Sequence, residues 1–376
     1  MTKIPPGLLP EGLSDRLPPQ AEAAAQLVRH VLDTVSSHGY QRVMPPLAEF
    51  EQNLVARLQS ARAQDLLRVV DPLSQRMMAL RPDMTAQVGR IAATRLSNAA
   101  RPLRLCYGGP VIKLRANQLR PEREMMQVGA ELIGTDSVAA AVEIVTVAIE
   151  ALQVAGLSGV TVDFTLPDLI DTLAAQEFPL TADEIPAVRA ALDAKDAGAL
   201  TGLGSGPAAY LPLIEATGPF HAAMDKLDAL DAVGALKSRT EALRAIAKPI
   251  SWDVTLTLDP TERHGFEYQT WFGFSLFAEG FVGEVGRGGT YMITHPDGRE
   301  EPAIGFSLYP DPLIDAGFAR EESMRLFLPI GHDAAKAGEL RREGWRTVAA
   351  LSSSDDGAAL GCTHVLQGQR PVLLKG

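Results

Sequence analysis

Strand signals in this sequence gather in two blocks, residues 103–133 and 250–308, and an alanine-rich stretch at about 167–247 separates them. Apolar and β-branched runs predict strands at 103–107, 111–114, 124–133, 250–258, 272–278, 280–285, 291–294 and 303–308. Alanine favours helix, so the stretch between the blocks is expected to be helical, with a glycine-rich break at 201–206. Blocks of strands set apart from helices are typical of an α+β fold with a mostly antiparallel sheet, and not of alternating βαβ units.

Further elements are predicted outside these blocks. Residues 21–37 have helical spacing that Gly39 can end, a second helix is expected to begin near Ala48, and a third spans about 83–98. Residues 66–70 and 76–80 predict two strands joined around Asp71. From Met324 onward, RLFLPI, DAAKAGELRREG and WRTVAAL predict strand, helix and strand. We therefore expect a core at residues 1–320 that carries the helical insertion, and a small α/β unit at residues 321–376.

Composition narrows the classes of function. Lys and Arg number 35 against 46 Asp and Glu, a net charge of -11, which argues against a protein whose main task is to grip nucleic acid. Cys106 and Cys362 are far apart and show no metal-type spacing, so they are expected to be reduced thiols. Prolines interrupt the N-terminus where an export signal needs an apolar run, and Glu143 and Glu150 interrupt the apolar stretch at 139–157. We expect a cytoplasmic protein that needs neither a membrane, a metal nor a cofactor.

No G-x-x-x-x-G-K-[ST] or G-x-G-x-x-G run lies between a strand and a helix, so no P-loop or Rossmann site is predicted. Three other segments do line up with one family. LRPDMTAQVGRI, the hairpin RLCYGGPVIKLRANQLRPEREMMQVGAELIG, and the late run RHGFEYQTWFGFSLF, GRGGTYM and AIGFSLY resemble the catalytic domain of histidyl-tRNA synthetase, in the same order. MPPLAEF resembles the dimer-interface motif of that family, with its proline at Pro45 or Pro46. Over residues 8–313 the resemblance implies the class II aminoacyl-tRNA synthetase fold and a homodimer.

Recognition of histidine needs acceptors for its ammonium, donors for its carboxylate and a polar group that reads the imidazole. The resemblance implies that Asp83 and Thr85 hold the ammonium, with Asp83 in place of the usual glutamate. Gln127 and Glu131 match a Q-x-G-x-E motif in which glutamine contacts the amino-acid backbone and glutamate bonds an imidazole nitrogen. Tyr291, in GGTY, matches a tyrosine near the ring.

Two further observations bear on this pocket. Positions 127, 129 and 131 of a strand face the same way, so Gly129 is expected to leave room between the two polar side chains. The family motif R-G-L-D-Y-Y aligns with residues 264–269, which adds His264 and Tyr268 to the predicted histidine site. The arginine of that motif has become His264, and whether Arg263 or His264 occupies its position stays open.

Adenylation makes a different demand, because arginines must bind the phosphate oxygens of ATP. The arginine of the family hairpin is Lys113 here, and the neighbouring glutamate is Arg115. The family's G-L-E-R turn aligns with a run in which Pro312 occupies the arginine position, and proline donates no hydrogen bond. These losses predict that no catalytic residues for amino-acid activation remain.

The charged hairpin, with Lys113, Arg115, Arg120 and Arg123, is expected to be a solvated surface, since a nucleic-acid patch would need more basic residues and aromatics. The tail at 324–376 resembles the start of the synthetase anticodon-binding domain but is too short to complete it. No work on tRNA is therefore expected.

A synthetase fold that keeps its histidine pocket and loses its ATP chemistry resembles the regulatory subunits of ATP phosphoribosyltransferase. That resemblance implies a non-catalytic partner of the short-form catalytic subunit, in the first step of histidine biosynthesis, which conveys feedback inhibition by L-histidine. Two alternatives stay open: a working but divergent histidyl-tRNA synthetase, and a histidine-binding module that serves another enzyme. The sequence leaves open the stoichiometry, the docking surface, the role of the C-terminal unit, and whether histidine binds in the ancestral pocket or at a subunit interface.

Overall fold

The computed structural model describes residues 7–55, 66–114, 122–251, 253–263, 268–318 and 324–374. The chain divides into two compact units, Met1–Ala319 and Arg320–Gly376.

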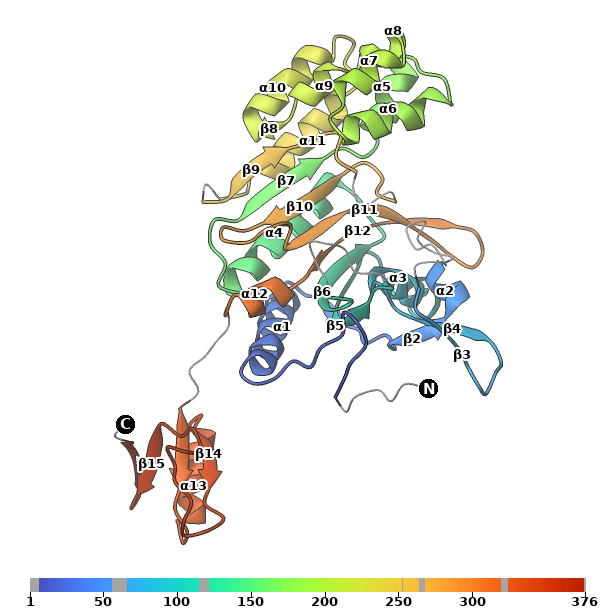
Figure 1. Cartoon of the computed structure of the whole chain (residues 1–376). Coiled ribbons are helices and arrows are strands. Elements are labelled where there is room, and N and C mark those ends of the chain that lie inside the picture. Colours follow the sequence, from blue (N-terminus) through green and yellow to red (C-terminus); the bar gives the residue numbers. More distant parts are fainter. Residues whose placement is uncertain are drawn as a thin grey trace. The chain divides into compact units, whose positions relative to one another are not determined.

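The larger unit is built on one sheet, which has nine strands in the described part of the chain, in the order β1-β5-β6-β12-β11-β10-β7-β9-β8 (Figure 1). The strands are β1 (Gln41–Arg42), β5 (Leu103–Ile112), β6 (Glu124–Ile133), β7 (Thr161–Thr165), β8 (Gly218–Pro219), β9 (Thr255–Leu258), β10 (Gly273–Phe277), β11 (Gly286–Thr294) and β12 (Glu300–Leu308). Only the β1–β5 and β7–β9 pairs are parallel. The expected α+β fold of the class II synthetase type, with a mostly antiparallel sheet, is confirmed.

The two faces of this sheet carry different layers, because side chains alternate along each strand. One face packs under α1 (Gln20–Ser37) and α4 (Val138–Val154), and its core includes Cys106, Val128 and Ala130. The other face packs under α3 (Thr85–Thr94), and its core includes Leu105, Tyr107 and Tyr291. The odd-numbered residues of β6, including 127 and 131, therefore point to the α3 side.

The apolar segment that was expected to pack is α4. It contributes much of the buried core, and its two carboxylates are engaged at the periphery: Glu143 accepts hydrogen bonds from Arg104 and from the Tyr40 hydroxyl, and Glu150 pairs with His38. Among the described helices, none is both long and apolar enough to cross a membrane.

The stretch between β7 and β9 is helical, as expected, apart from the two residues of β8. It consists of α5 (Leu169–Gln176), α6 (Glu184–Asp193), α7 (Ala197–Gly202), α8 (Ser205–Ala208), α9 (Pro212–Glu215), α10 (Phe220–Leu230) and α11 (Lys237–Ala247). The predicted glycine-rich break falls between α7 and α8. These helices gather beyond the β7–β9 end of the sheet (Figure 1), and we call them the helical insertion.

Three local predictions differ from the structure. The helix expected to begin near Ala48 is α2 (Glu51–Val55), which begins three residues later because β2 (Ala48–Phe50) first pairs with β4 (Met77–Leu80). Residues 280–285 form a turn, since Gly280 and Gly283 have positive φ angles of 84° and 82°. The two strands predicted at 103–107 and 111–114 are one strand, β5, because residues 108–110 stay paired with β6.

Other local predictions fared better. The strands predicted around Asp71 are β3 (Arg68–Val70) and β4, and the helix predicted at 83–98 is the shorter α3. The charged loop of the β5–β6 hairpin, with Arg115 and Arg120, lies outside the described residues.

The smaller unit has a four-stranded sheet in the order β14-β13-β15-β16. The predicted strand–helix–strand is confirmed as β13 (Arg325–Leu328), α13 (Ala334–Arg342) and the parallel β14 (Arg346–Ala349). The hairpin of β15 (His364–Gln367) and β16 (Arg370–Leu373) was not anticipated. Its small core is formed by Leu326, Leu328, Ala337, Leu340 and Leu366.

Candidate functional site

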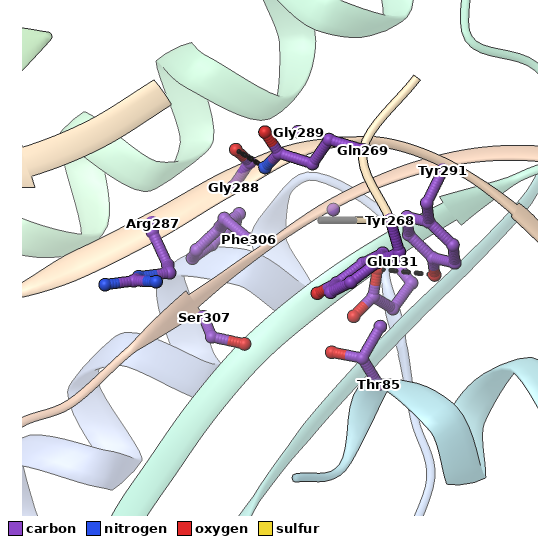
Figure 2. A pocket seen from close by; sticks show the side chains of 11 residues that line it. Thr85, Glu131, Tyr268, Gln269, Arg287, Gly288, Gly289, Tyr291, Phe306 and Ser307 are labelled. Carbon is purple, nitrogen blue, oxygen red and sulfur yellow. Dashed lines mark hydrogen bonds between the residues drawn. The ribbon is translucent and has the colours of Figure 1, made fainter. Parts of the chain in front are cut away.

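A pocket of about 240 Å³, counting its open mouth, lies on the α3 side of the sheet. It is formed where β6, β11 and β12 run side by side and the first residue of α3 faces them. Figure 2 shows the side chains of Thr85, Glu131, Tyr268 and Tyr291 pointing toward one another in this pocket. The lining residues are Thr85, Glu131, Tyr268, Gln269, Arg287, Gly288, Gly289, Tyr291, Gly305, Phe306 and Ser307.

The centre of the pocket is a buried carboxylate. Glu131 is 1% exposed, and its two oxygens accept hydrogen bonds from the hydroxyls of Tyr107, at 2.9 Å, and Tyr291, at 2.8 Å. Burial raises the pKa of Glu131 to about 8, although the hydrogen bonds from Tyr291 and Tyr107 oppose that shift. Near neutral pH this carboxyl group is poised to hold or release a proton, and it retains oxygen lone pairs for a polar ligand group.

Two glycines make room for this arrangement. Gly305 lies directly opposite Glu131 in the β6–β12 register, and a Cβ at residue 305 would come within 1.7 Å of the Glu131 Oε2. Gly129 faces Tyr107, and a Cβ there would come within 2.7 Å of the Tyr107 hydroxyl oxygen. The absence of side chains at these positions lets a polar carboxylate–tyrosine cluster occupy the middle of a sheet.

A second polar cluster joins the start of α3 to β6. Asp83 accepts a hydrogen bond from the Thr85 backbone N–H at 2.7 Å and another from the Gln127 side-chain amide at 2.7 Å. The Gln127 amide also donates to the Ser307 hydroxyl at 2.8 Å, and its oxygen accepts from the Met84 N–H at 2.8 Å. Asp83 is thus held at the N-terminal end of a helix by two donors, which fixes the direction of its negative charge.

The aromatic wall is formed by Tyr268 and Tyr291, whose rings pack edge to face with centroids 6.1 Å apart. Burial raises the pKa of both hydroxyls well above the ordinary value, so both remain protonated. Gln269 ties this wall to β11 through a 2.7 Å hydrogen bond from its amide to the Gly288 carbonyl. The ring wall and the buried carboxyl group together suit a flat, polar, nitrogen-containing ring.

The structure brings six of the seven predicted site residues together. Thr85, Glu131, Tyr268 and Tyr291 line the pocket, while Asp83 and Gln127 join it through Ser307. The seventh, His264, lies outside the described residues, so the choice between it and Arg263 stays open.

Sequence reasoning missed Tyr107 and Ser307. The Tyr107 hydroxyl bonds Glu131 and also lies 3.1 Å from both the Thr85 and Ser307 hydroxyls. The alternation of β5 against the predicted Gln127–Glu131 face could have identified it, because Tyr107 pairs with Gly129 in the hairpin.

Comparison with known proteins assigns the chain to a family. The family model of histidyl-tRNA synthetase matches residues 12–313. An ATP phosphoribosyltransferase regulatory subunit of Rhodospirillum centenum is 43% identical over 383 residues, which cover 96% of this chain and 95% of that protein. One of Paramagnetospirillum magneticum is 41% identical over 367 residues and covers 96% of each chain. The chain belongs to the family of ATP phosphoribosyltransferase regulatory subunits.

Solved structures agree with this family on the fold. An ATP phosphoribosyltransferase regulatory subunit/histidyl-tRNA synthetase of Bacillus halodurans superimposes with a TM-score of 0.81 at 23% identity. The match covers 96% of this chain and 97% of that one. This likeness confirms the expected fold, and the family model and the relatives confirm the expected relation to the synthetases and to the regulatory subunits.

The residues that the synthetase resemblance assigns to phosphate binding, here called the phosphate side, are arranged differently from the Glu131 pocket. Pro312 lies in the first turn of α12 (Asp311–Asp315), where the synthetase resemblance puts an arginine. Beside it, Asp311 accepts a 2.7 Å hydrogen bond from the Met126 N–H and pairs with Arg16. Arg16 and Asp311 offset each other's charge, so this pair leaves no net positive charge for a phosphate beside Pro312.

The cations near the pocket are engaged elsewhere. Among the described lining residues only Arg287 is cationic; it pairs with Glu284, and Figure 2 shows its guanidinium pointing away from Glu131. Arg81 is buried and donates to the Pro45 and Pro110 carbonyls. Within the described ranges, no group of three His, Cys, Asp or Glu side chains is placed to hold a metal ion.

Proposed function

We propose that this chain is the non-catalytic regulatory subunit of ATP phosphoribosyltransferase, and that it binds L-histidine in the Glu131 pocket to convey feedback inhibition. The observation that carries the proposal is an intact, buried Glu131–Tyr107–Tyr291 cluster beside a phosphate side that holds Pro312 and Asp311. The names of the relatives support the choice of enzyme, and the shape and polarity of the pocket support the choice of ligand. The complex would work in the cytoplasm, in the first step of histidine biosynthesis.

In this proposal, Glu131 reads the imidazole ring. Its pKa of about 8 means that it holds a proton at neutral pH before the ligand arrives. A neutral imidazole can then take up that proton and bind as imidazolium against carboxylate, or bind by a hydrogen bond without transfer; both arrangements contain the same number of protons. A charge-assisted bond inside a buried site is the stronger of the two and selects a basic ring over a phenyl ring.

The ammonium and carboxylate of histidine are assigned to the second cluster. Asp83, which is half-buried and joined to the pocket through Gln127 and Ser307, would offer its charge, and Thr85 would offer a hydroxyl. The amide of Gln127 already donates to Asp83 and to Ser307, so in this proposal it acts by aligning these two groups for the amino-acid backbone. For the carboxylate of histidine, Arg287 is the only arginine among the described residues that line the pocket.

The partners follow from the same proposal. The chain would assemble with the short-form catalytic subunit, and a homodimer would form through the MPPLAEF region. An apolar surface supports that dimer: Met44 and Leu73 are 81% and 94% exposed, and Leu47, Val69 and Val70 are also exposed. Charging of tRNA has no place in this scheme, because the chain would not activate histidine.

Three measurements on the purified chain test the function together. Isothermal titration with L-histidine should show binding, ATP–pyrophosphate exchange should be absent, and mixing with the cognate short-form catalytic subunit should raise phosphoribosyl transfer and make it sensitive to histidine. Histidine-dependent exchange would instead establish a divergent synthetase. Histidine binding with no effect on a saturated catalytic subunit would establish a module that serves another enzyme.

A further inference from the structure

One buried hydroxyl group, that of Tyr107, joins the carboxyl cluster of the pocket to the polar cluster at the start of α3. Tyr107 is fully buried, and its oxygen lies 2.9 Å from Glu131 Oε1. The same oxygen lies 3.1 Å from the Ser307 hydroxyl and 3.1 Å from the Thr85 hydroxyl. In the proposed function, Glu131 and Thr85 contact opposite ends of histidine. The Tyr107 hydroxyl therefore connects the two ends of the ligand site.

The hydrogens of these hydroxyl groups can be counted, and the count gives each bond a direction. A tyrosine hydroxyl has one hydrogen to donate, and Tyr107 donates it to Glu131. Toward Ser307 and Thr85 it can then only accept, so both of these must donate. Ser307 fits this direction, because it already accepts an N–H of Gln127 and keeps its own hydrogen for Tyr107. Burial raises the pKa of Tyr107, and the bonds from Ser307 and Thr85 oppose that rise, as donors do.

This direction decides how Thr85 meets a ligand. Its single hydroxyl hydrogen points inward to Tyr107, so the oxygen lone pairs are what it presents to the pocket that it lines. Its backbone N–H bonds Asp83, which places the hydroxyl close in sequence and space to that carboxylate. An ammonium group can only donate and a carboxylate can only accept. A site with this polarity therefore suits the ammonium of an amino acid and disfavours its carboxylate.

The direction is the same whether or not Glu131 carries a proton. Its two oxygens accept from Tyr107 and Tyr291, and a protonated carboxyl group keeps acceptor capacity beside its one donor. Its hydrogen can then point to a ligand nitrogen. In the reverse arrangement Glu131 would donate to Tyr107, and the Tyr107 hydrogen would turn toward Thr85. Thr85 would then present a donor to the ligand, and its hydroxyl would not favour an ammonium.

We infer that Tyr107 is a positioning residue that turns the Thr85 hydroxyl hydrogen away from the ligand, so that the pocket selects an imidazole compound that also carries an ammonium group. This inference rests on the proposed function in one respect, the occupation of the pocket by histidine. The competing account is that the Tyr107 hydroxyl only stabilises the sheet. Under that account, its removal would weaken the binding of every ligand alike.

The test measures a preference, the ratio of two dissociation constants. Histidine is compared with imidazolepropionate, which is histidine without its ammonium, by titration into full-length wild type, Tyr107→Phe, Thr85→Val and the double variant. Wild type should bind histidine at least tenfold more tightly than imidazolepropionate. Each single variant should reduce this preference at least threefold. The double variant should match Thr85→Val within twofold, because Tyr107 acts through Thr85 and the two changes are not additive.

Two controls separate this role from folding. Tyr40 is also buried and its hydroxyl bonds a glutamate, Glu143, at 2.8 Å, but on the opposite side of the sheet. Tyr40→Phe should keep both dissociation constants within twofold of the wild type even where thermal unfolding shows a lower Tm. Thr85→Ser, which keeps a hydroxyl, should retain the preference within twofold.

The outcomes that overturn the inference differ from those that overturn the proposed function. Wild type that binds neither ligand would overturn both. Wild type that binds histidine, with a preference that is unchanged in Tyr107→Phe or with equal losses for the two ligands, would leave the proposed function intact and make Tyr107 a structural residue. Additive losses in the double variant would also overturn the inference. If Tyr107→Phe does not fold, the Thr85 variants decide: a preference kept in Thr85→Ser and lost in Thr85→Val supports the inferred direction, and one kept in both overturns it.

Discussion

The candidate site has two sides that differ: an amino-acid side around Glu131, and a phosphate side formed by the residues that the synthetase resemblance assigns to phosphate binding. On the amino-acid side, buried polar groups satisfy one another: Glu131 with Tyr107 and Tyr291, and Asp83 with Gln127. On the phosphate side, Lys113 is exposed, and Pro312 lies in the first turn of α12, where the synthetase resemblance implies an arginine. A buried polar cluster is costly when only partly satisfied, and the hydrogen bonds among these groups satisfy one another. We therefore propose that the chain keeps recognition of an amino acid and has lost its activation.

The phosphate side should show the largest effect, the absence of adenylation. Loss of a single transition-state donor costs about 10²–10³ in rate, so loss of several should remove measurable ATP–pyrophosphate exchange. The assay uses histidine, ATP and labelled pyrophosphate, with a histidyl-tRNA synthetase as the positive control. Exchange at one hundredth of that control rate would mean that the chain still activates histidine with ATP.

The amino-acid side should be sensitive to a much smaller change, Glu131→Gln. This variant keeps the size of the side chain and removes the carboxyl group, which in this proposal becomes charged when it passes its proton to the imidazole. A hydrogen bond to a charged group contributes roughly 1.5–3 kcal/mol, so the dissociation constant and the inhibition constant of histidine should rise about tenfold or more. Asp83→Asn should act in the same direction on the ammonium, and activation of the catalytic subunit should survive in both variants.

Glu143→Gln is the matched control for this experiment. Glu143 also accepts a hydrogen bond from a tyrosine, Tyr40, but it lies on α4, on the opposite side of the sheet. Glu143→Gln should leave the dissociation constant of histidine unchanged. Because the coupling between histidine and activity is reciprocal, inhibition that persists unchanged in both Glu131→Gln and Asp83→Asn would place the sensor at a subunit interface.

Stability should carry a pH signature of the buried carboxyl group. The pKa of Glu131 is raised from 4.5 to about 8 in the folded chain, so its contribution is fully present below pH 4.5 and is lost as pH rises through 8. Wild type should therefore lose on the order of a few kcal/mol relative to Glu131→Gln between pH 5 and pH 9. Thermal unfolding of both proteins across that range measures it; parallel curves would show that Glu131 is ionised throughout.

Much of the fold followed from the sequence because alternation along the strands is a local signal. It placed β6 correctly and put residues 127 and 131 on one face. It failed where tertiary pairing overrides local preference: Pro110 breaks the pattern of β5, yet Pro110 stays paired with Met126, and its carbonyl accepts from Arg81. Residues 280–285 failed for another reason, because two glycines in positive φ make a turn within an otherwise apolar run.

The same contrast applies to the prediction of the pocket residues. Residues carried by a motif were found, and residues that enter through pairing geometry were not. Tyr107 precedes Gly108 and Gly109 in a stretch that was interpreted only as a strand, and its role depends on the space left by Gly129 across the hairpin. That role could not be derived before the register of the hairpin was known.

The smallest effect should come from Lys113→Ala, which changes the phosphate side alone. Lys113 is exposed just beyond the end of β5, and exposed charges are strongly screened by solvent and salt. Histidine affinity should change by less than twofold, and activation of the catalytic subunit should be unaffected, because the two sides are energetically separate in this interpretation. A tenfold loss in Lys113→Ala, comparable with that in Glu131→Gln, would mean that the hairpin still reaches the bound amino acid. Lys113 would then belong functionally to the amino-acid side, and the phosphate side would have kept a role in binding.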